Sequence, residues 1–272
     1  LIAGNHDHIR KDSYYRTFSW SENVHPLFGN RSQYLVLEHL DTAVYGFSYE
    51  TKEILESRYD GLCAQKKAGI EILLAHGGDE KHIPINGNAL KRSGFDYVAL
   101  GHIHKPQIVV KGMAAYAGAL EPTDKNDTGK HGFIRGEIRG GETRISFVPF
   151  AKREYLHLAL NVDKMMTARS VMDRILEMIK ERGAENLYKF TLKGFRDPEL
   201  IFEREWDEVS GNILEIVDET VPAYDFRKIR EENRSNLIGR YIESFEGCVP
   251  ESIEWQALCE GVQALMESRG GM

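Results

Sequence analysis

Short apolar runs alternate with polar stretches along the first half of the chain. Their length and their content of β-branched and aromatic residues are typical of buried strands. We predict such strands at residues 33–38, 43–49, 70–76 and 95–104, and the tail of another at 1–3. Between them, residues 52–67 are polar and prone to form a helix, and residues 88–94 predict a short helix closed by Gly94. This alternation indicates an α/β fold.

The pattern changes after residue 106. Residues 107–118 and 132–150 each contain two apolar runs around a glycine turn, which predicts two hairpins. A strand at 155–162, a helix at 168–183 and strands at 187–195 and 212–224 follow. Helical spacing of apolar residues then predicts two C-terminal helices, at 234–245 and 252–269, joined at 247–250.

These elements suggest three parts: an α/β domain at 1–150, a small α+β domain at 151–232 and a C-terminal helical segment at 233–272. No apolar run approaches the ~20 residues that cross a bilayer, so we expect no membrane partner. The three cysteines are odd in number and widely spaced, which favours free thiols and a cytoplasmic protein over a disulfide framework.

The net charge of −7 is unevenly distributed. Residues 1–150 contain 18 basic and 18 acidic side chains, so the whole excess of negative charge lies in residues 151–272. The chain has no overall basic character for binding nucleic acid. A polyanion bound by the first part would therefore depend on local patches or on metal ions.

Polar, metal-competent side chains follow three of the predicted strands. Asn5 and His6 follow residues 1–3, His76 ends the strand at 70–76, and His102 and His104 follow the apolar run at 97–100. Ligands of open α/β sheets bind at the carboxyl ends of strands. Imidazole and amide ligands suit Mn, Fe and Zn. We therefore predict a metal site formed by Asn5 and these histidines, with His82, His131 and His157 outside it and His8 undecided.

The order and spacing of these residues resemble the calcineurin-like metallophosphoesterases. Three motifs of that family are present: Gly-Asn-His-Asp at 4–7, a lone His76, and Gly-His-x-His at 101–104. The family's two earlier motifs, Asp-x-His and Gly-Asp-x-x-Asp, are absent. The resemblance thus implies a metallophosphoesterase β-sandwich flanked by helices, with its N-terminal strands missing. We expect the missing carboxylates upstream of Leu1, and expect this chain alone to hydrolyse DNA poorly.

Within that superfamily the chain is similar to the SbcD-type exonucleases of DNA repair. The likeness is densest from Ile70 to Tyr155, including the segments after Gly101–His104. Ala117-Gly118-Ala119 departs from the more usual Pro-Gly-Ser, and the stretch between His76 and Gly101 is short for the family. In this interpretation the 151–232 domain is the capping domain.

The resemblance implies a two-metal site. Asn5, His76 and His102 would bind one ion and His104 the other, with Mn²⁺ expected and Mg, Fe or Zn as alternatives. His6 would stabilise or protonate the leaving oxygen, with its ring donating a hydrogen bond to Asp7. Weaker candidates for contacts to the DNA backbone are Arg10, Lys11 and Lys105.

Two other functions fit the same residues. A small-molecule phosphodiesterase or a phosphatase of the superfamily would keep the metals and change the substrate. Alternatively, the chain is an inactive scaffold or binding module, which would neither hold catalytic metals nor hydrolyse a substrate. The SbcD-type resemblance further implies DNA as a partner, a possible homodimer, and an SbcC-type, SMC-like ATPase whose coiled-coil base would dock on residues 234–269. An apolar stripe containing Trp255 and Leu258 is the predicted contact.

Overall fold

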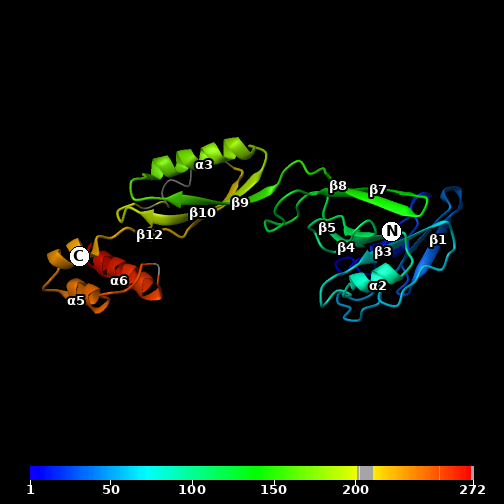
Figure 1. The fold of residues 1–272 in the computed structure, drawn as a ribbon, viewed down its shortest axis with the longest axis horizontal. Coiled ribbons are helices and arrows are strands. Elements are labelled where there is room, and N and C mark those ends of the chain that lie inside the picture. Colours follow the sequence, from blue (N-terminus) through cyan, green and yellow to red (C-terminus); the bar gives the residue numbers. More distant parts are fainter. Residues whose placement is uncertain (201, 203–210, 251, 271–272) are drawn as a thin grey trace. The chain divides into compact units, whose positions relative to one another are not determined.

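The computed structural model describes residues 1–200, 202, 211–250 and 252–270, and it divides the chain into two compact units, Leu1–Tyr155 and Leu156–Met272. Figure 1 shows the elements of both. None of the helices in the described ranges combines the length and the apolar character that a bilayer crossing requires.

The first unit is built on a six-stranded sheet with the order β1-β2-β3-β4-β6-β5. Its strands are β1 (Gln33–Leu37), β2 (Thr42–Gly46), β3 (Ile70–His76), β4 (Tyr97–Gly101), β5 (Gln107–Val110) and β6 (Ala114–Tyr116). Four neighbours, β2, β3, β4 and β6, run parallel, while the edge strands β1 and β5 are antiparallel to their partners. The predicted strands at 33–38, 43–49, 70–76 and 95–104 are thus confirmed, although the second ends at Gly46 and the fourth at Gly101.

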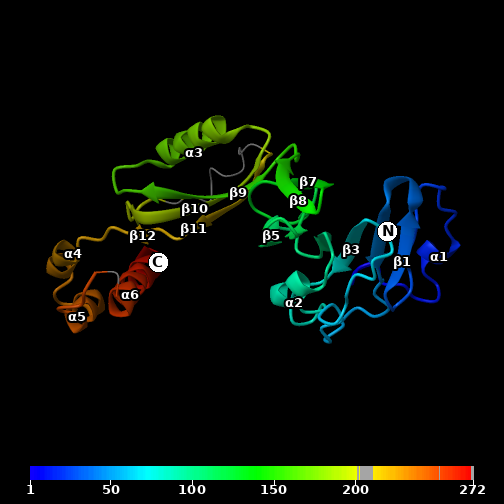
Figure 2. The same cartoon turned by 45° about the vertical axis from the view of Figure 1, so that its right-hand side comes forward.

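Apolar side chains of the central strands form the core of this unit. Tyr45, Leu73 and Val98 are fully buried and belong to one cluster. The unit also contains α1 (Tyr14–Thr17), a 3₁₀ turn (Glu38–Leu40), α2 (Gly87–Arg92), and the hairpin of β7 (Gly132–Arg139) and β8 (Glu142–Pro149). Figure 2 labels α1, β1 and α2 of this unit. The mixed sheets and flanking helices match the predicted α/β class.

Two predictions about local structure in this unit are wrong. Residues 1–3 are not assigned to a strand, although Tyr49 N donates to Ala3 O over 3.1 Å. The helix expected at 52–67 does not form either. Ile54, only 3% exposed, donates its amide to Lys81 O and accepts from Ile83 N. These tertiary hydrogen bonds replace the bonds within a helix that the local composition favours.

The second unit has the predicted β-α-β character. It contains β9 (Tyr155–Val162, which begins at the unit boundary), α3 (Ala168–Arg182), β10 (Leu187–Arg196), β11 (Ile213–Asp218) and β12 (Val221–Pro222). Strand β10 pairs with β9, β11 and β12, and α3 covers one face of this sheet (Figure 1). Thr167 caps α3, and Val171, Ile175 and Ile179 are its buried residues.

Three helices complete this unit: α4 (Phe226–Glu232), α5 (Leu237–Ser244) and α6 (Ile253–Gly270). The sequence predicted the last two and missed α4, whose N-cap is Asp225. Ile238, Ile242, Leu258 and Val262 form their shared core. The two predicted apolar stripes therefore pack on each other, and Trp255 packs against Phe195 and Phe226.

Candidate metal and catalytic site

The candidate site lies at the carboxyl edge of the six-stranded sheet. Because β2, β3 and β4 are parallel, the residues that follow them meet at one edge. The loop that contains Asn5 joins the same edge, since Tyr49, just after β2, bonds to Ala3 on one side and to Ile9 N over 2.7 Å on the other. This register brings together side chains that are nearly 100 positions apart in sequence.

Asn5 is the centre of the cluster. Its side chain is 3% exposed, and its amide oxygen lies 2.8 Å from His76 Nε2 and 3.3 Å from His102 Nδ1. The rings of the two histidines are 5.2 Å apart. One buried oxygen and two imidazole nitrogens thus converge, which is a ligand set suited to a transition-metal ion.

His76 is held through its backbone as well as through its ring. Tyr59 Oη accepts from His76 N over 2.9 Å and donates to His76 O over 3.2 Å, and Tyr49 Oη donates to the same carbonyl over 3.0 Å. Burial lowers the pKa of the His76 imidazole to about 4, and the nearby His102 adds to the effect. The ring is therefore neutral near pH 7, which is the form that binds metal.

Asp79 and His82 extend the cluster, and the sequence argument assigned neither to it. Asp79 Oδ2 lies 2.8 Å from His102 Nε2, and Asp79 Oδ1 lies 2.8 Å from His82 Nδ1. Burial alone would raise the pKa of Asp79, but hydrogen bonds from His102 and His82 lower it overall. A metal ion could be held by Asp79, His82 and His102, whose candidate ligand atoms lie within 4.8 Å of one another.

This carboxylate also orients His102. With Nε2–H directed at Asp79, the other ring nitrogen, Nδ1, faces Asn5 and is left as the ligand atom. His102 also has a φ of +97°, a conformation that non-glycine residues seldom adopt. Strain of this kind is concentrated at functional sites, where the surrounding structure enforces it.

His104 faces different partners from His102. Its Nδ1 lies 3.1 Å from Asp127 Oδ2 and 3.1 Å from Thr123 Oγ1. Burial alone would raise the pKa of Asp127, but hydrogen bonds from Thr123 and His104 lower it overall. Among the described residues, no hydrogen bond or ion pair joins His104 to the Asn5 cluster, so the two histidines of Gly-His-x-His face apart.

The structure gives Asp7 a role that differs from the predicted one. Its Oδ1 accepts from Gly4 N over 2.7 Å and its Oδ2 accepts from Tyr15 Oη over 2.7 Å. In the part of the chain that the structure describes, no hydrogen bond joins it to His6, which is exposed. Asp7 thus closes the loop around Asn5 through its hydrogen bonds with Gly4 and Tyr15.

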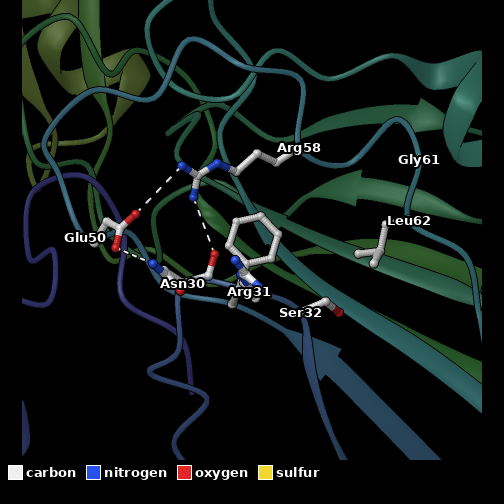
Figure 3. A pocket seen from close by; sticks show the side chains of 8 residues that line it. Asn30, Arg31, Ser32, Glu50, Arg58, Gly61 and Leu62 are labelled. Atoms are coloured by element: carbon white, nitrogen blue, oxygen red, sulfur yellow. Dashed lines mark hydrogen bonds and ion pairs between the residues drawn. The ribbon is translucent and has the colours of Figure 1, made fainter.

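Basic side chains lie around this edge of the sheet. Arg10, Lys11 and Lys105 are all exposed, and Arg10 forms an ion pair of 3.6 Å with Asp12. Beyond β2, a cavity of about 540 Å³ is lined in part by Arg31 and Arg58. Figure 3 shows that cavity, with Glu50 between the Arg58 guanidinium and the Asn30 side chain.

Comparison with known proteins shows which family the first unit resembles. Residues 1–106, which lie within this unit, match the family model of the calcineurin-like phosphoesterases. The chain is also similar to the uncharacterized metallophosphoesterase YhaO of Bacillus subtilis (strain 168). The two are 26% identical over 218 residues, which cover 75% of this chain and 52% of that protein. The chain spans about half the length of this curated relative.

Proposed function

We propose that this protein hydrolyses phosphodiester bonds at DNA ends with divalent metal ions, as an SbcD-like exonuclease or endonuclease. The observation that carries the proposal is the convergence of Asn5 Oδ1 with His76 Nε2 and His102 Nδ1 at the carboxyl edge of the sheet. The family match supports metal-dependent phosphoester hydrolysis. The choice of DNA as the substrate rests on the resemblance of the sequence to SbcD-type exonucleases.

The residues present fit a metal site. The buried Asn5 amide, the neutral His76 ring and Nδ1 of His102 would hold one ion, with Asp79 orienting His102. His104 would contact a second ion, and Asp127 would orient the His104 ring. When bound, divalent ions polarise a phosphodiester and lower the pKa of an attacking water; Mn²⁺ is the ion we expect.

His6 supplies the proton in this proposal. It is exposed and follows Asn5 directly, so its imidazole can reach a substrate held at the site. It donates a proton from a ring nitrogen to the oxygen that leaves phosphorus, and solvent then reprotonates the ring. Asp7 keeps the loop that carries His6 in place through Gly4 and Tyr15.

A small-molecule phosphodiesterase or phosphatase would use the same histidines. DNA is favoured by the exposed Arg10, Lys11 and Lys105 near the site, since cations that contact the phosphate backbone supply much of the affinity for DNA.

Substrate preference is therefore the first prediction. With MnCl₂, the full-length protein is expected to shorten a linear duplex end-labelled with a fluorophore, at a rate well above its hydrolysis of bis-p-nitrophenyl phosphate. The Lys11→Ala and Lys105→Ala variants should bind DNA more weakly, and their DNA affinity should depend less steeply on the salt concentration. Hydrolysis of the small ester should be unchanged. Efficient cleavage of the small ester without any action on DNA would contradict the proposal and favour the alternative.

The proposal includes a partner, an SbcC-type ATPase that docks on residues 234–269. Leu258 is 4% exposed and Trp255 packs within the unit, so neither is available as a free anchor. Leu237, Ile253 and Met266 remain exposed at 65%, 81% and 44%. Exposed apolar side chains on helices suit the face of a partner helix.

The second prediction tests that surface. Leu237→Asp combined with Ile253→Asp should abolish co-purification with a co-expressed SbcC-type ATPase while the melting temperature is unchanged. Leu176→Asp is the matched control, because Leu176 is also exposed, at 43%, but lies on α3. If the double variant still co-purifies like the wild type, this surface is not the docking site.

A further inference from the structure

Five aromatic side chains form a cluster in the segment that connects the Gly4–Asp7 loop to β1, and none of them belongs to the main core of the first unit. We call it the aromatic ledge; its members are Tyr14, Tyr15, Phe18, Trp20 and Phe28. Tyr15 stacks on Phe28 at 5.5 Å, and Trp20 lies 5.7 Å from Tyr15 and 4.9 Å from Phe18. The ledge is thus one continuous array of rings.

The outer rings of the ledge face solvent. Tyr14 is 71% exposed and Phe18 is 42% exposed, and their ring centroids are 5.4 Å apart. Burying such rings would be favourable, so their exposure marks a surface with a use beyond packing. Trp20 and Tyr15 are only partly exposed, and Trp20 packs edge-on against Phe18.

The ledge is connected to the catalytic loop by hydrogen bonds. Tyr15 Oη donates to Asp7 Oδ2 over 2.7 Å, and Asp7 Oδ1 accepts from Gly4 N over 2.7 Å. His6 lies between Gly4 and Asp7 in the chain, and both of these residues are held by the hydrogen bond that joins them. A molecule resting on the ledge would therefore lie beside the loop that carries His6 and Asn5.

Cations are interleaved with the aromatic rings. Arg10, Lys11 and Arg16 are exposed, and Arg16 Nε donates to Arg10 O over 3.0 Å. The only carboxylate between residues 10 and 20 is Asp12, which pairs with Arg10. Aromatic rings alternating with cations are the composition that binds single-stranded nucleic acid, where bases stack and phosphates are neutralised.

We propose that the aromatic ledge binds unpaired nucleotides of the DNA strand that enters the site, by stacking their bases on Tyr14 and Phe18. This inference rests on the proposed nuclease function and refines its substrate to ends with a single-stranded or frayed segment. Stacking of one base on an aromatic side chain changes affinity on the order of 5- to 150-fold. A blunt, fully paired end cannot offer its base faces in this way.

Binding rather than cleavage tests the ledge. Anisotropy of fluorophore-labelled DNA with phosphorothioate linkages would be measured with the full-length protein and MnCl₂, on a blunt duplex and on one with an overhang. The wild type is expected to bind the overhang at least about fivefold more tightly. Tyr14→Ala with Phe18→Ala should remove that preference with native melting, whereas Tyr14→Phe with Phe18→Tyr should keep it.

A matched control comes from another exposed aromatic pair of the same unit. Phe133 and Phe150 are 38% and 58% exposed, with ring centroids 5.9 Å apart. Phe133→Ala with Phe150→Ala should leave the overhang preference intact. If the Tyr14/Phe18 alanine variant keeps the full preference, the ledge inference is overturned and the nuclease proposal stands. If the wild type binds neither DNA, both proposals fail.

Discussion

Replacement of His6 by alanine is expected to lower kcat for phosphodiester hydrolysis by about 10²–10⁴-fold, the usual contribution of general acid–base catalysis. The metal content should remain that of the wild type, because the buried cluster around Asn5 does not include the exposed His6. Steady-state kinetics and elemental mass spectrometry on the same preparation measure the two quantities.

His102→Ala is the comparison for that experiment. It removes a ring that faces Asn5 on one side and Asp79 on the other, so it should lose bound metal and activity together. His39→Ala is the matched control, because His39 is exposed in the 3₁₀ turn that precedes β2, at the opposite edge of the sheet. Loss of metal from His6→Ala as complete as from His102→Ala would show that the role assigned to His6 is wrong.

Gly4→Ala is expected to weaken metal binding by about tenfold or more, the range seen when groups that support metal ligands are disturbed. A Cβ at Gly4 would overlap the Cε1 and Nε2 atoms of the His76 ring. The ring must move away from Asn5 Oδ1, and the crowding should also destabilise the fold by roughly 1–3 kcal/mol. Metal titration and thermal melting report the two effects.

Gly61→Ala is the control for this substitution. A Cβ at Gly61 would meet no atom within 4 Å, so its melting temperature and metal affinity should equal those of the wild type. Wild-type metal affinity in Gly4→Ala would show that the position of the His76 ring does not determine metal binding.

The convergence of the site residues was predictable because it depends on a general property of parallel sheets. Asn5, His76 and His102 each follow an apolar run, and parallel strands place the residues after such runs at one edge. The hairpins at 107–118 and 132–150 were predictable for a similar reason, since glycine turns between apolar runs are local signals.

The partners of those residues were not predictable in the same way. Asp79, His82 and Asp127 lie in loops without a periodic pattern, and their contacts depend on how the loops fold over the sheet edge. For Asp79, the only signal in the sequence was its position three residues after His76, in a glycine-rich loop. The segment at 52–67 shows the same limit, because long-range bonds from Ile54 outweigh its local helix propensity.

The sequence by itself determined which residue types follow which apolar runs in this protein, and that these residues gather at one edge of a sheet. Only the tertiary structure decided how each side chain is held. It directs Asp79 at His102, commits both oxygens of Asp7 to Gly4 and Tyr15, and leaves Tyr14 and Phe18 exposed next to the loop. Strand periodicity is a local property of the chain, whereas hydrogen-bond partners and exposure depend on segments that meet only after folding.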